Sequence, residues 1–202
     1  MQSADVASPG VELQGWLRDH QIKISEIARF LDGLDHAERV AAIRSLGSKE
    51  QRKLYEGADG FRSLTLEDLV PNTAADFSTV RHFGKNSLPV FTHFEKRLCR
   101  PANASGELYG FNFQTMAPVT GPGYFIARAA AERPEVIVDY HRVPREHPEG
   151  WPPIRSNDRG LSRFVYGSLV DTLRGVSNHV SIGSAARKGK DLGNFFVLCR
   201  QE

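Results

Sequence analysis

Proline is missing from two long windows of this sequence. None occurs between Pro9 and Pro71 or after Pro153, so ten of the eleven prolines fall from Pro71 to Pro153. Proline removes a backbone donor and breaks helix interiors, so the first window can carry helices. The middle window must consist of strands, turns and irregular connections. The sequence therefore predicts a chain that is helical first and sheet-rich afterwards.

Cysteine and long apolar runs are also scarce. The two cysteines, Cys99 and Cys199, each stand in the tripeptide Leu-Cys-Arg. In a reducing compartment we expect two buried thiols, although strands ending there could approach one another if they are neighbours. No run reaches the roughly 20 apolar residues of a membrane helix, and the first five residues lack the regions of a signal peptide. We therefore expect a cytoplasmic protein without a membrane span.

No strong excess of one charge is present. The net charge of +2 is too small to indicate nucleic acid as a partner. Residues 1–70 hold nine Lys and Arg against twelve Asp and Glu, whereas residues 71–202 hold seventeen against twelve. The basic run 187–190 could meet phosphate or acidic lipid, but it suits a solvated hairpin tip better. The helical part is thus slightly acidic and the sheet part basic.

Apolar residues recur at helical spacing from residue 11 to residue 60. Asp35 with Glu38 is a helix-start signal, and Gly47 is a stop. Three or four short helices are expected, with a further helical turn at 65–69. After residue 71 the period changes, and strands are predicted over 90–100, 108–115, 124–131, 136–143, 176–182 and 194–200.

Two segments are less regular. Residues 76–82 are ambiguous, and 164–173 could be strand, helix or one of each, with strand favoured by its aromatic and β-branched start. Residues 144–157 hold four prolines and Trp151, which is typical of a long ordered loop or a flap. About six to eight antiparallel strands follow the helices in total.

The predicted fold class is α+β, a helical segment packed on an antiparallel sheet that is curled or closed. So many strands leave exposed edges unless the sheet closes or stacks on another, and we favour a barrel over a sandwich. Three parts are expected: a mobile N-terminus at 1–10, a helical subdomain at 11–70 and a β-domain at 71–202 with the proline-rich loop 144–157. At the level of architecture alone this arrangement is similar to lipocalin-like barrels.

Two pairs of residues are candidates for catalysis. His93 with Glu95, and Asp139 with His141, have the spacing that puts both side chains on one face of a strand. If the strands were close together, two imidazoles and two carboxylates could bind a metal or transfer protons. The pattern is weak, because charged strand faces produce it by chance and no established metal-ligand spacing supports it. No metal site is predicted, and solvated or salt-bridged histidines are the simpler reading.

Aromatic residues are the candidates for ligand binding. Their number exceeds what a small barrel needs to fill its centre, and tyrosine and tryptophan supply polar tips that orient a ligand. Packing as core residues is the simpler alternative. If the ligand hypothesis holds, we expect Tyr109, Phe111 and Phe113 to face the barrel interior. The full set of expected ligand-binding residues is Tyr109, Phe111, Phe113, Tyr124, Tyr140 and Trp151.

The sequence contains no nucleophile elbow, phosphate loop or metal motif. The favoured function is binding of an apolar or aromatic small molecule inside a curled sheet, for which a barrel of about eight strands has room. An enzyme that uses the His and carboxylate residues is one alternative. Another is an interaction module that binds a protein partner through residues 11–70. The sequence indicates no particular cofactor.

Overall fold

The computed structural model describes residues 8–19, 21–89, 92–102, 106–114, 121–158, 160 and 162–202. Most of the N-terminal segment expected to be mobile lies outside these residues. Helices form first along the chain, as the proline distribution predicts. They are α1 (Pro9–Arg18), α2 (Ile24–Gly33), α3 (His36–Ser45), α4 (Ser48–Gly57), α5 (Leu66–Leu69) and, later, α7 (Ser162–Val165).

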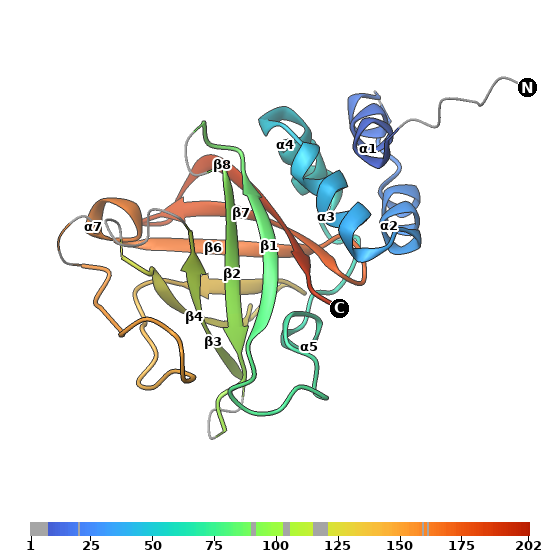
Figure 1. Ribbon diagram of the computed structural model, residues 1–202. Helices are drawn as coiled ribbons and strands as arrows, with labels where there is room; N and C mark the ends of the chain where they lie inside the picture. The colour runs from blue at the N-terminus through green and yellow to red at the C-terminus, as the bar shows by residue number, and fades with distance from the viewer. Residues whose placement is uncertain are drawn as a thin grey trace, which may run out of the picture.

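Eight antiparallel strands then close into a barrel in which each strand pairs with its neighbours in sequence and β8 pairs with β1 (Figure 1). The predicted α+β barrel is thus confirmed. Among the described residues, no helix is long and apolar enough to cross a membrane. The strands are β1 (Val80–Asn86), β2 (His93–Cys99), β3 (Glu107–Phe113), β4 (Tyr124–Ala129), β5 (Val136–Asp139), β6 (Leu169–Gly175), β7 (Val180–Arg187) and β8 (Lys190–Arg200).

Several boundaries differ from the sequence prediction. The ambiguous segment at 76–82 leads into β1, which continues to Asn86. The segment 164–173 contains one of each element rather than the favoured single strand, because α7 ends at Val165 and β6 begins at Leu169. The last hairpin is longer than expected, and its turn is the basic run 187–190, where Lys188 and Gly189 have positive φ. That run therefore lies at a hairpin tip.

Strand register decides which residues face the interior. Lys96 on β2 pairs with Asn112 on β3, and Gly110 on β3 pairs with Phe125 on β4. These even-numbered residues of β3 point inward, and Tyr109, Phe111 and Phe113 point outward. The expectation that these three aromatic residues face the interior is therefore wrong. Successive side chains of a strand point to opposite faces, so only one face of β3 can lie inside the barrel. The face that carries Gly110 and Asn112 is smaller than the aromatic face and fits the crowded interior better.

Three glycines make room for aromatic rings inside the barrel. Gly84, Gly110 and Gly183 lie directly across from Phe94, Phe125 and Phe196 on neighbouring strands. A Cβ atom on any of these glycines would lie within 2.7 Å of the opposite ring. The rings therefore lie over bare backbone, and those of Phe94 and Phe196 also line the cavity described below.

One end of the barrel is filled. Leu64, Leu69 and Val70, from α5 and its flanks, belong to the same buried cluster as the inward-facing barrel residues. His82 is fully buried there, and its Nε2 lies 2.9 Å from the carbonyl oxygen of Leu69. The interior is consequently packed at this end, and α7 lies on the opposite side of the barrel (Figure 1).

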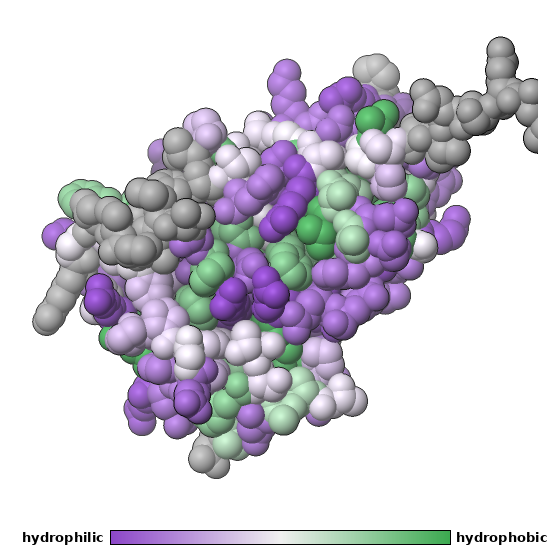
Figure 2. All heavy atoms as spheres, viewed as in Figure 1, coloured by the Kyte–Doolittle hydropathy of each residue, from purple (hydrophilic) through white to green (hydrophobic). Residues whose placement is uncertain are grey.

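Helices α1–α4 pack on the outside of the barrel. Their apolar residues form one buried cluster with Val180, Ile182, Val197 and Cys199 of β7 and β8. On the face seen in Figure 2, hydrophilic residues cover most of these helices and hydrophobic ones surface in small groups. The division of the chain at residues 10 and 70 stays a prediction.

The proline-rich loop 144–157 covers the outward aromatic face of β3 and β4. Trp151 lies 4.7 Å from Phe111 between ring centroids, and its Nε1 donates a hydrogen bond of 2.8 Å to Thr79. Asn157 donates to the carbonyl oxygens of Tyr124 and Tyr140 at 2.7 and 2.8 Å. These bonds fasten the loop to the barrel wall.

Candidate functional site

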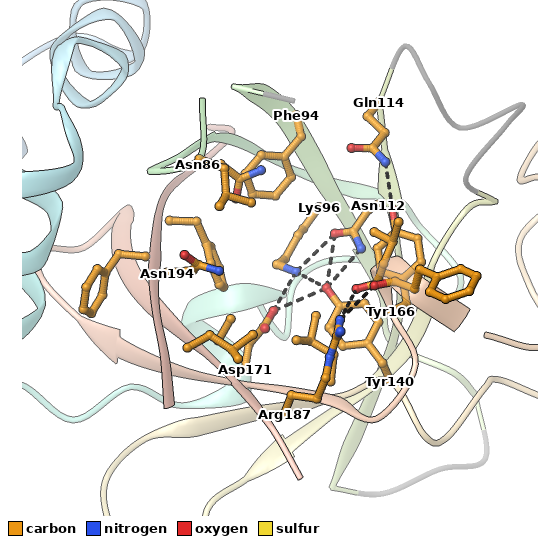
Figure 3. A pocket seen from close by; sticks show the side chains of 18 residues that line it. Asn86, Phe94, Lys96, Asn112, Gln114, Tyr140, Tyr166, Asp171, Arg187 and Asn194 are labelled. Carbon is orange, nitrogen blue, oxygen red and sulfur yellow. Dashed lines mark hydrogen bonds and ion pairs between the residues drawn. The ribbon is translucent and has the colours of Figure 1, made fainter. Parts of the chain in front are cut away.

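A lysine lies inside the barrel. Lys96 on β2 is only 2 % exposed, and its Nζ donates hydrogen bonds to Asn112 Oδ1 at 3.1 Å, to Tyr140 OH at 2.5 Å and to Asp171 Oδ2 at 3.2 Å (Figure 3). The acceptors come from β3, the end of β5 and β6. Four segments of the barrel therefore meet at one ammonium group.

Aromatic rings surround the same ammonium. The centroids of Phe196, Phe125, Tyr140 and Phe94 lie 4.8, 4.9, 5.1 and 5.8 Å from Nζ. Each ring within about 6 Å can attract a cation through its electron-rich face. These rings replace part of the hydration that burial removes from Lys96.

The buried charges shift each other's titration. Burial lowers the pKa of Lys96, although the Asp171 carboxylate opposes that shift. Burial raises the pKa of Asp171, and Lys96 opposes that shift in turn. The pKa of Tyr140 is raised well above its ordinary value by burial and by Asp171. Each charged form is thus supported mainly by its partner rather than by solvent.

Tyr140 and Tyr166 extend the network toward α7. Their rings stack with centroids 5.5 Å apart and planes 14° from parallel. Tyr166 OH accepts a hydrogen bond of 2.8 Å from Gln114 Nε2. Gly123 permits this stack, because a Cβ there would lie 2.4 Å from the Tyr166 ring.

A cavity of about 300 Å³ lies above this network, toward α7. Figure 3 shows Lys96, Asn112, Tyr140 and Asp171 converging at its base, with Phe94 beside them. Its rim carries three of the large apolar side chains that the structure leaves exposed: Leu88 at 36 %, Phe164 at 74 % and Leu192 at 40 %. A polar base under apolar walls is the usual composition of a site for a small molecule.

Unpartnered polar atoms are rare at this site. Among the described residues that line the cavity, two buried side-chain polar atoms have no hydrogen-bond partner, Asp171 Oδ1 and Arg187 Nε. The other end of the Arg187 guanidinium donates to the carbonyl oxygens of Phe164 and Val165, both at 3.1 Å. Two residues of the cavity lining thus each keep one unused buried atom, an acceptor on Asp171 and a donor on Arg187.

The aromatic residues expected to bind ligand divide between two places. Tyr140 belongs to the cavity. Tyr109, Phe111, Tyr124 and Trp151 form a separate buried cluster on the outer face of the barrel. Phe113 is 46 % exposed there, under the guanidinium of Arg97 at 3.7 Å from its centroid.

A groove runs along that outer face between β3 and the proline-rich loop. Phe111, Phe113 and Trp151 line it together with Arg97 and Arg155. The role of the outer aromatic residues in ligand binding stays a prediction.

The candidate catalytic pairs lie on the outer face and on separate strands. Glu95 on β2 accepts hydrogen bonds from Arg81 at 2.7 Å and from Arg97 at 3.0 Å, and His93 is exposed at the start of the same strand. His141 Nδ1 lies 3.0 Å from Asp139 Oδ1 at the end of β5. Two strands, β3 and β4, separate β2 from β5. The structure therefore does not bring the two pairs together, because side chains that point outward from distant strands of a barrel diverge.

The described part of the chain shows neither a metal-binding cluster nor a reactive thiol. No group of three or more His, Cys, Asp or Glu side chains there could hold a metal ion. Cys99 and Cys199 are both free and buried. Burial raises the pKa of Cys99 to about 12 and that of Cys199 to about 11, so neither is a reactive thiolate.

Sequence reasoning missed Lys96, Asn112 and Asp171 as site residues. A signal for Lys96 was present, because alternation along β2 places it between Phe94 and Leu98 on an otherwise apolar face. An ionisable residue in that position indicates a buried partner. No local signal identifies Asp171 as that partner, since 75 positions separate the two residues.

Comparison with models of protein families, with curated proteins and with solved structures finds no match for this chain. The geometry of the barrel interior is therefore the basis for a functional proposal.

Proposed function

We propose that this protein binds a small, largely apolar molecule in the barrel cavity, with the Lys96 network at the base of the site. The observation that carries the proposal is the cavity itself, about 300 Å³ of space with apolar walls above a buried polar cluster. Barrels of eight strands are just wide enough for one small ligand. A cytoplasmic location for this activity stays a prediction.

The apolar rim supports the same proposal. Leu88, Phe164 and Leu192 project from three different segments and are exposed, although exposure of large apolar groups to water is unfavourable. A ligand that enters between them would remove some of this surface from water. Their position at the open end, opposite the end filled by α5, agrees with entry at this side.

The test is binding of a naphthalene-based fluorescent probe to the purified protein and to two matched variants. Ala185 on β7 lines the cavity, whereas Ala186 beside it points to the opposite face of the strand. We expect Ala185→Phe to weaken probe binding strongly, because the new ring occupies the cavity. Ala186→Phe should bind as the wild type does.

Circular dichroism of both variants controls for the fold. If the wild type binds no probe, or if Ala185→Phe binds as tightly as Ala186→Phe, the cavity is not the binding site.

A further inference from the structure

We propose that the cavity selects molecules that carry a neutral hydroxyl group, an alcohol or a phenol, which donates a hydrogen bond to the Asp171 carboxylate. This inference rests on the proposed function and identifies the chemical class of the ligand. It follows from counting which hydrogen-bonding positions at the base of the cavity are already used.

Lys96 has no donor left for a ligand. An ammonium group carries three N–H donors, and Asn112, Tyr140 and Asp171 accept all three within 3.2 Å. A ligand carboxylate or carbonyl could bind Lys96 only by displacing one of these buried acceptors. Displacement would leave that acceptor unsatisfied in the interior, which is costly.

The donors of Tyr140 and Asn112 are also used, and the acceptor oxygen of Asn112 is neutral and already receives Lys96. Tyr140 OH accepts from Lys96 and from Asn112 Nδ2, and it lies 3.3 Å from Asp171 Oδ2 as a donor. The Asn112 amide donates to Tyr140 OH at 3.0 Å and to the carbonyl oxygen of Gly123 at 3.3 Å. Neither side chain keeps a free donor.

Asp171 is different, because only one of its oxygens is used. Oδ2 receives both Lys96 and Tyr140, whereas Oδ1 is buried without a partner on a side chain that lines the cavity. A carboxylate oxygen is an acceptor, so it requires a donor. A ligand hydroxyl would satisfy the unsatisfied oxygen and recover the cost of its burial.

Two features favour an ionised Asp171 as that acceptor. The rings of Phe94, Phe125 and Phe196 and three acceptors surround the Lys96 ammonium, which stabilises its charge and with it the ion pair. A proton on Oδ1 would have no protein acceptor to bond. The same surroundings disfavour a cationic amine as ligand, because it would lie beside the Lys96 charge at low dielectric.

Arg187 does not alter this requirement. Its Nε is the other unpartnered buried atom among the cavity-lining residues, and its N–H can donate a hydrogen bond only to a ligand oxygen or nitrogen. A hydroxyl and an ether both carry such an oxygen. A comparison between a hydroxyl compound and its methyl ether therefore isolates the donor.

The experiment measures the affinity of naphthalene, 2-naphthol and 2-methoxynaphthalene by competition with the fluorescent probe at neutral pH. We expect 2-naphthol to bind about tenfold more tightly than 2-methoxynaphthalene, because a hydrogen bond to a charged group is stronger than one between neutral groups. Equal affinities for the three compounds would overturn the inference while leaving the proposed function intact. Failure of all three and of the probe to bind would instead contradict the proposed function.

Two variants localise the effect. The double variant Lys96→Met/Asp171→Leu replaces the ion pair with apolar groups of similar size. It should lose most of the preference for 2-naphthol, because the acceptors that remain at the base, on Asn112 and Tyr140, are neutral. Asn194→Ala removes a polar side chain of the same cavity that lies outside the network, and it should keep the preference. An undiminished tenfold preference for 2-naphthol in a folded double variant would contradict the role of Asp171. If that variant does not fold, the comparison of the three compounds on the wild type decides the matter.

Discussion

Lys96 Nζ lies 3.2 Å from Asp171 Oδ2, although the two residues come from β2 and β6, which are opposite each other in the order of eight strands. The pair therefore spans the barrel interior instead of linking neighbours. Each side chain is at most 3 % exposed. Few donors or acceptors other than those of the barrel itself are available to stabilise the two charges.

Removal of one member of this pair should be far more harmful than removal of both. Lys96→Met leaves the Asp171 carboxylate buried without its counter-charge, so we expect the free energy of unfolding to fall by about 3–5 kcal/mol. Lys96→Met/Asp171→Leu should recover most of that loss, because no isolated charge remains. Urea denaturation of the three proteins measures the difference, and a double variant less stable than the single one would refute this account.

His82 should make the protein less stable in acid. Burial lowers the pKa of His82 from 6.5 to about 4, with smaller contributions from Arg200 and Lys96, while its hydrogen bond to Leu69 opposes the shift. Between these two values the unfolded chain binds a proton that the folded protein does not. The stability that neutral His82 contributes is therefore complete above pH ~6.5. As the pH falls toward ~4, the free energy of unfolding decreases by roughly 3 kcal/mol.

The His82→Gln variant isolates this effect. Glutamine keeps an amide donor for the Leu69 carbonyl oxygen but does not titrate. Chemical denaturation at a series of pH values should show a shallower loss of stability in acid for the variant than for the wild type. Parallel profiles would mean that His82 is protonated at its ordinary pKa in the folded protein.

Phe111→Ala should affect stability and not cavity binding. Phe111 is 2 % exposed and packs against Trp151 and Tyr124 on the outer face. We expect a loss of about 3–5 kcal/mol in the free energy of unfolding, as for other buried aromatic truncations. Probe binding below the denaturation midpoint should be unchanged, and its loss in a stably folded variant would move the binding site to the outer groove.

Gly110→Ala should strain the base of the site. A Cβ at Gly110 would lie 2.4 Å from the Phe125 ring and 2.9 Å from the backbone oxygen of Arg97, which cannot move as a side chain can. Overpacking of this kind costs about 1–3 kcal/mol. The matched control is Gly15→Ala in α1, where no atom lies within 4 Å of the new Cβ.

The control should be neutral or stabilising, since alanine favours helix more than glycine does. Thermal denaturation of both variants provides the comparison. A Gly110→Ala protein as stable as the Gly15→Ala protein would show that Phe125 has room to shift.

Local patterns were sufficient for the order of elements. Proline placement separated helices from strands because its effect on backbone donors acts within a few residues. Asp35 and Glu38 form the predicted capping box at the start of α3 for the same reason. The boundaries at β1 and α7 were not predictable, because tertiary packing decided between conformations that the local sequence allows.

The sequence by itself determined that helices precede an antiparallel sheet and that each strand has two chemically different faces. Tertiary structure decided which face is inside. On β3, Gly110 and Asn112 face the interior and the aromatic side chains face outward. The ring of Phe125 fills the space beside Gly110, so the closed barrel has no room there for the three aromatic side chains of β3. Closure also brought Lys96 to Asp171, a contact that no local pattern encodes because it depends on the register of every strand between them.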